Sequence, residues 1–168
     1  MTKVAFTGHR PKDLYGYDTR EPYKIVARKI AENLKTLDNE LIVITGGAQG
    51  IDQLAFWAAE HLKKEGWNVK NILAVPFKGQ ELRWSQTGMF SQTEYRKMLT
   101  MADKVVYLSD NSQDAVRKLD ERNHWMVDKS DVLVCVTPYV DIEHRPGGTG
   151  NCVRYAVSRN HPYLIWKI

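Results

Sequence analysis

The sequence has few cysteines, no long hydrophobic run and no excess of acidic residues. Its two cysteines, Cys135 and Cys152, lie in apolar segments without the paired spacing of zinc sites or redox motifs, so we interpret both as buried free thiols. No apolar run approaches the roughly 20 residues that cross a bilayer. The first residues lack the basic and apolar regions of a signal peptide. We therefore expect a cytoplasmic protein with no membrane partner, no bound metal and no cofactor.

The chain has a small positive net charge. The 24 basic and 20 acidic residues give a formal net charge of +4, and the basic residues are scattered along the chain. Such a surface tolerates anions but does not by itself indicate a nucleic-acid partner, which stays a less favoured possibility. The length of 168 residues and the 43% hydrophobic content are typical of one globular domain, which we expect over residues 1–168.

Strand-like and helix-like segments alternate from end to end. Hydrophobic periodicity predicts strands at 3–7, 41–45, 69–75, 105–108, 132–136 and 163–166, and helices at 23–37, 51–64, 92–101, 115–129 and 149–159. Several strands are apolar on both faces, which is typical of a parallel sheet covered on both sides. The predicted fold is α/β, a single Rossmann-like, doubly wound, mostly parallel sheet flanked by helices on both faces.

Three unusual segments follow predicted strands, where such sheets bind ligands. Residues 7–10 (TGHR) combine a flexible glycine with an arginine that could pair with a phosphate. Residues 46–52 (GGAQGID) and 146–151 (PGGTGN) each open a helix with glycines, whose free amides and helix dipole favour an anion. Residues 46–52 are neither a P-loop nor the GxGxxG fingerprint. Asp52 is interpreted either as a helix-capping residue or as an acceptor for ribose hydroxyls.

These motifs resemble a known superfamily. Residues 46–52 are similar to the GGAxGID turn of the DNA-processing protein A family. The segment from Arg122 through PGGTG resembles the LOG family of cytokinin-activating phosphoribohydrolases. Both belong to the SLOG superfamily of Rossmann-like proteins, and the TGHR start is closest to its YpsA-like branch. The resemblance implies nucleotide-derived ligands, such as second messengers or ADP-ribose-like signals, and self-association into a homo-oligomer.

The LOG resemblance leaves enzymatic activity open. LOG enzymes cleave an N-glycosidic bond with an arginine, which Arg122 matches, and with the glutamate of PGGxGTxxE. Arg154 occupies the position of that glutamate here, and a guanidinium cannot act as a carboxylate. Asp52 and Arg122 are the candidate catalytic residues if a relocated acid sustains the reaction.

We accordingly predict a sensor or sequestering module that binds a nucleotide or nucleotide-derived ligand. The alternatives are a LOG-like nucleoside-phosphate N-glycosidase and a DNA-processing-A-like protein that binds single-stranded nucleic acid. Trp84, in a long irregular loop, is a candidate for stacking on a base. The predicted ligand-binding residues are Gly8, His9, Arg10, Gly46, Gly47, Ala48, Gly50, Asp52, Trp84, Arg122, Gly147, Gly148, Thr149 and Gly150.

Overall fold

Six strands form one continuous sheet in the computed structural model, which describes all 168 residues. Across the sheet their order is β4-β3-β2-β1-β5-β6, and every neighbouring pair is parallel. The predicted parallel sheet is therefore confirmed. The strands are β1 (Thr2–Gly8), β2 (Glu40–Thr45), β3 (Asn68–Val75), β4 (Lys104–Tyr107), β5 (Val132–Thr137) and β6 (Tyr163–Lys167).

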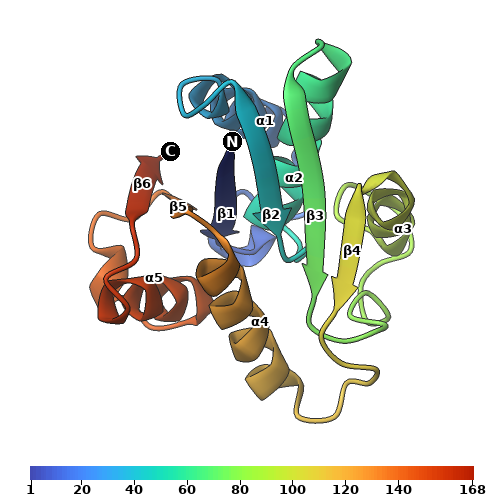
Figure 1. Cartoon of the computed structure of the whole chain (residues 1–168). Helices are drawn as coiled ribbons and strands as arrows, with labels where there is room; N and C mark the ends of the chain where they lie inside the picture. The colour runs from blue at the N-terminus through green and yellow to red at the C-terminus, as the bar shows by residue number, and fades with distance from the viewer.

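Five α-helices connect the strands and cover both faces of the sheet. Figure 1 shows α1 and α2 behind the strands and α4 in front of them. This two-sided cover confirms the doubly wound Rossmann-like fold. The helices are α1 (Glu21–Leu34), α2 (Ile51–Lys64), α3 (Gln92–Met101), α4 (Ala115–Lys129) and α5 (Gly148–Ser158).

The two faces of the sheet carry separate apolar cores. Phe6 and Val43 contribute to the larger core beneath α1 and α2, and Trp166 packs edge-on against Phe6 from β6. Cys135 and Cys152 belong to the smaller core beneath α4 and α5. Both are buried free thiols, as predicted, and burial raises the pKa of each to about 12, so neither is a ready nucleophile.

The predicted elements agree closely with the observed ones, with one clear correction. The helix expected to reach Leu37 ends at Leu34, because the amides of Thr36 and Leu37 turn back to bond the carbonyls of Asn33 and Leu34. Leu37 still packs against the core from this turn, which explains why its periodicity looked helical. Each of the five α-helices is too short or too polar to cross a membrane.

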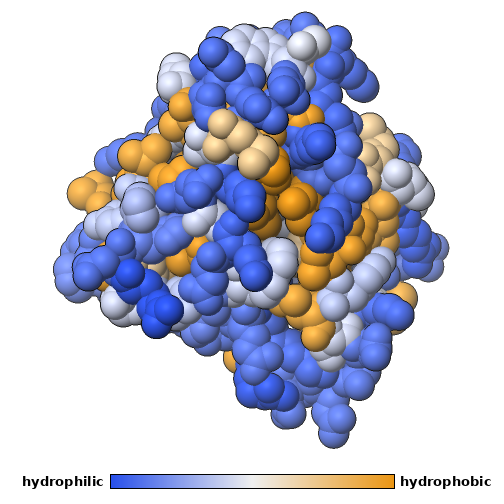
Figure 2. Space-filling model, viewed as in Figure 1, coloured by the Kyte–Doolittle hydropathy of each residue, from blue (hydrophilic) through white to orange (hydrophobic).

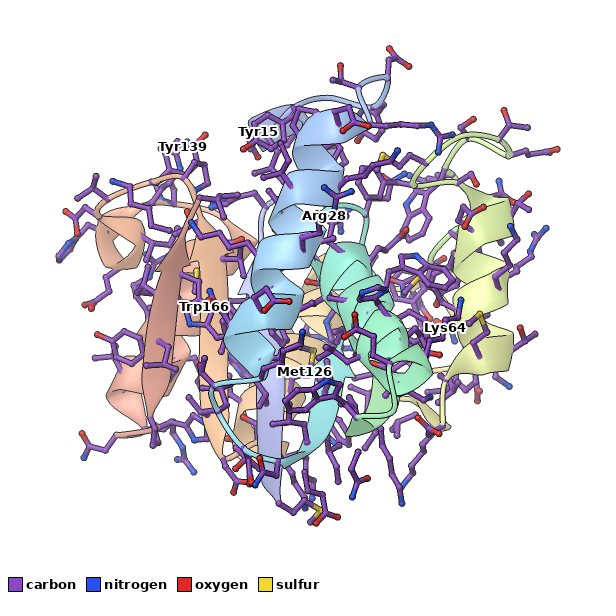
Figure 3. The ribbon with its side chains drawn as sticks, turned by 90° about the horizontal axis from the view of Figure 1, so that it is seen from above. Tyr15, Arg28, Lys64, Met126, Tyr139 and Trp166 are labelled. Atoms are coloured by element: carbon purple, nitrogen blue, oxygen red, sulfur yellow. The ribbon has the colours of Figure 1, made fainter.

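The sheet has a switch point between β1 and β5, which are neighbours. The chain leaves β1 for α1 on one face and leaves β5 for α5 on the other, so the two connections diverge. Tyr15 and Tyr139, which follow these strands, lie at the same edge of the molecule in Figure 3. A crevice at the carboxyl ends of the strands is the expected consequence.

Candidate functional site

A cleft of about 1590 Å³ opens at this switch point. Segments that follow β1, β2 and β5 form its floor, and α4 and α5 form its walls. In the view of Figure 2, hydrophilic side chains dominate the lower part of the molecule, where α4 and α5 lie. The cleft is consequently a polar site at the edge where ligands of such sheets bind.

The start of α5 presents unused amides to the cleft. No carbonyl or side chain of the protein accepts the N–H of Gly147, Gly148, Thr149 or Gly150, and Asn151 is the first residue whose amide bonds to a main-chain carbonyl. Gly147 has a φ of +108°, which favours glycine. The positions of Gly147 and Gly148 face open space, and the cleft lining includes Gly147, Gly148 and Thr149. Gly150 is buried and does not line the cleft. Three residues with free donors and the positive end of the helix dipole thus meet at the cleft.

The turn before α2 lies mostly outside the cleft surface. Its glycines, Gly46, Gly47 and Gly50, do not line the cleft, and a Cβ at Gly50 would overlap the carbonyl oxygen of His9. The amide of Ala48 donates to the Asp52 carboxylate at 3.4 Å. These glycines allow the chain to pack closely. The amides of Gly47 and Gly50 also bond to no main-chain carbonyl, but of this turn only Ala48 and Asp52 lie on the cleft surface.

Asp52 and Arg122 form the charged floor of the cleft. Both are buried, and they attract each other without a direct ion pair. Burial raises the pKa of Asp52, and the charge of Arg122 opposes that shift. Burial likewise lowers the pKa of Arg122, and Asp52 opposes this. The Arg122 guanidinium donates to the carbonyl of Gly46 at 2.6 Å, so its position is fixed.

The segment after β1 brings the other predicted residues to the same place. Gly8 is required because a Cβ there would overlap the side chain of Ile51. His9 shares a 2.7 Å hydrogen bond with Thr137 at the end of β5, and burial lowers its pKa, so this imidazole is neutral near pH 7. Arg10 lines the cleft and takes part in no ion pair, which leaves its charge available.

Among the cleft residues that the sequence reasoning missed is Arg145, which is held by Tyr139. Arg145 lies directly before the second glycine turn, and its guanidinium stacks on the Tyr139 ring at 3.4 Å from the ring centre. The His9 ring meets the same Tyr139 ring edge-on. A basic residue beside PGGTG was the available signal, but the stacking partner depends on how the loop folds.

Trp84 lies outside this cleft. It packs edge-on against Tyr95 and lines a separate pocket of about 340 Å³ with Tyr17, Arg83 and Phe90. The long loop therefore places Trp84 outside the cleft but beside the first glycine turn, whose Gln49 lines the same second pocket. Its predicted role in base stacking remains a prediction for that second pocket.

The charges around the cleft favour an anion. Its lining includes six lysines and arginines and four aspartates. Two of these aspartates are engaged by neighbours, Asp114 by Arg117 at 3.4 Å and Asp120 by His124 at 3.6 Å. Nowhere in the chain do three His, Cys, Asp or Glu side chains gather closely enough to hold a metal ion.

The chain has relatives of similar length. It is 32% identical over 149 residues to the SPbeta prophage-derived protein YoqJ of Bacillus subtilis, covering 83% of this chain and 82% of that protein. It is 27% identical over 139 residues to the UPF0398 protein YpsA of the same organism, covering 80% and 74% respectively.

A solved structure supports the fold. DNA processing protein A from Streptococcus pneumoniae superposes with a TM-score of 0.60 over 98% of this chain, at 16% identity, and the chain spans half the length of that protein. The family model described as the YspA SLOG family matches residues 4–166, nearly the whole sequence. The chain belongs to the YspA SLOG family, as the glycine turns indicated.

Proposed function

We propose that this protein binds a nucleotide or nucleotide-derived anion in the cleft at the switch point, as a sensor or sequestering module. The observation that carries the proposal is the set of unused amides on Gly147, Gly148, Thr149 and Gly150. An amide without an acceptor is costly unless water or a ligand supplies one. Because these donors converge at a helix N-terminus, a phosphate group is the ligand that satisfies most of them at once.

Other residues of the cleft would bind further groups of the ligand. Arg10 and Arg145 have no carboxylate partner and would pair with phosphate oxygens. Asp52, an acceptor fixed at the floor, would take hydrogen bonds from ribose hydroxyls. A cleft of about 1590 Å³ leaves room for a ligand larger than a mononucleotide.

Two experiments test this proposal. Heating the purified protein and analysing the released small molecules by mass spectrometry should yield a phosphorylated nucleoside derivative. Melting in the presence of a nucleotide panel should show a shift for at least one member. A ligand at 100 times its Kd adds about 2.7 kcal/mol, which is about 5–11 °C for a chain of this length. No release and no shift at millimolar concentration would reject binding.

A second candidate is a nucleoside-phosphate N-glycosidase. The observation that favours it is the buried Asp52, whose raised pKa suits a group that donates or shares a proton, beside the fixed cation of Arg122. Release of free base from AMP, abolished in Asp52→Asn but not in a surface variant such as Asn39→Asp, would establish this activity. Binding without base release would leave the sensor proposal in place.

Nucleic-acid binding is the third candidate, and its support is the fold shared with the pneumococcal DNA processing protein A. Affinity for single-stranded DNA that falls steeply with salt would favour it, because phosphate contacts release counterions.

Self-association is a further part of the proposal. Leu164 and Ile165 on the edge strand β6 are each 39% exposed. A second copy of the chain packed on this edge would bury their apolar surface. Sedimentation equilibrium should then report a mass above one chain of 19.4 kDa.

A further inference from the structure

Arg154 occupies the position at which LOG-type enzymes carry a glutamate, and the structure gives it a different task. Its guanidinium donates to the carbonyl of Glu143 at 2.6 Å and to the carbonyl of Arg145 at 2.8 Å. It also donates to the side chain of Asn151 in the first turn of α5. One planar group therefore ties the loop before α5 to the helix itself.

The helix approaches this loop closely. A Cβ at Gly150 would overlap the carbonyl oxygen of Arg145 and would lie 3.0 Å from that of Ile142. Ile142 begins the short 3₁₀ turn Ile142–His144, and Arg145 follows it directly. The Ile142 carbonyl accepts from the amide of Arg145, and Arg154 supplies the donor for the Arg145 carbonyl as well as for that of Glu143.

Arg145 lies between an anchored aromatic ring and the free amides. Toward its amino end, Tyr139 receives the guanidinium of Arg145 on its ring face. The amide of Tyr139 donates to the Thr137 hydroxyl at 3.1 Å, which anchors the ring to β5. Toward its carboxyl end, the free amides begin at Gly147, two residues beyond Arg145.

We propose that Arg154 is a positioning residue of the anion site. It holds the carbonyl of Arg145 in place. The Arg145 guanidinium, stacked on Tyr139, and the amides of Gly147 to Gly150 can then bind the same phosphate. Arg145 makes the contact, and Arg154 acts through it. The position at which LOG-type enzymes carry a glutamate is then part of a binding site in this chain. This inference rests on the proposed function, since it concerns the same anion.

The test is a titration of ¹⁵N-labelled protein with inorganic phosphate, followed at the amide signals of Gly147, Gly148, Thr149 and Gly150. The wild type should show saturable shifts at these four signals. Arg154→Met should weaken phosphate binding by at least about tenfold, the worth of one charge-assisted contact. Arg159→Met is the matched control, because Arg159 is an exposed arginine at the end of the same helix, and its titration should equal the wild type.

Coupling distinguishes positioning from a general structural effect. Arg145→Met should weaken phosphate binding, and adding Arg154→Met to it should cost much less than Arg154→Met costs alone. Fully additive losses, or an Arg154→Met titration equal to the wild type, would overturn the inference. If Arg154→Met does not fold, Arg154→Gln takes its place. Its phosphate affinity should be weaker than that of the wild type, and an affinity equal to the wild type would again refute the inference. A wild type without any response would instead remove the proposed function itself.

Discussion

Gly148→Asp should separate folding from ligand binding. Gly148 lies in the first turn of α5, its added side chain would meet open space, and its φ is not in the left-handed region. An acidic residue in the first helical turn gains about 0.3–1 kcal/mol from the helix dipole. For a chain of this length, the melting midpoint of the free protein should therefore rise by about 1–4 °C.

The same change should eliminate phosphate binding. The new carboxylate lies where the anion would sit, and two like charges about 4 Å apart repel by about 4 kcal/mol at an effective dielectric constant near 20. Nucleotide affinity should fall at least about 100-fold. Calorimetric titration and thermal melting measure both effects. Asn39→Asp, which makes the same charge change next to the amino end of β2, is the control. Wild-type affinity in Gly148→Asp, or a midpoint several degrees lower, would refute the reasoning.

Three further changes test other parts of the site. Asp52→Asn should weaken nucleotide binding roughly tenfold but leave inorganic phosphate binding unchanged, because it removes a charged acceptor for hydroxyls; equal losses in calorimetry would contradict that role. Gly46→Ala should lower the melting midpoint by about 2–10 °C, because its Cβ would overlap the buried Arg122 guanidinium, whereas Gly148→Ala, which faces open space, should not. The pKa of His9 is lowered in the folded protein. The unfolded chain therefore binds a proton at His9 at higher pH than the folded protein does, and stability declines as pH falls below about 6.5. His9→Gln should flatten that decline in melts between pH 7.5 and 5.5, and an unchanged slope would exclude His9 as its cause.

Local signals explain why the elements were predictable. The observed α2, α3 and α4 coincide with the predicted segments 51–64, 92–101 and 115–129. Before α3, the Ser91 side chain accepts the amide of Glu94 as an N-cap, which fixes where this helix begins. Apolar strand segments and glycine turns are likewise local, so they can be recognised without knowledge of the tertiary structure.

The site was predictable only where the fold class fixes its position. Arg122 and the second glycine turn lie on the cleft because the carboxyl ends of parallel strands share one edge. The stack of Arg145 on Tyr139 depends on the path of a loop, which periodicity does not encode. The sequence showed Arg154 only as a missing carboxylate, whereas its function in the fold is to bond two loop carbonyls.

The first glycine turn illustrates the limit of motif physics. Paired glycines after a buried strand were expected to free amides for a ligand. Here the Gly46 carbonyl accepts from Arg122, and Gly47 lies where a Cβ would press on Tyr95 at 2.9 Å. Glycine is needed in both kinds of turn, for approach to a ligand or for approach to the chain itself, and only the packed structure distinguishes them.

A crystal structure grown with a nucleotide that shifts the melting midpoint would test the central claim most directly. We expect a phosphate with oxygens about 2.7–3.2 Å from the amide nitrogens of Gly148, Thr149 and Gly150, and with the Arg145 guanidinium beside it. A nucleotide bound elsewhere, such as the pocket beside Trp84, with those amides in contact only with water, would contradict it.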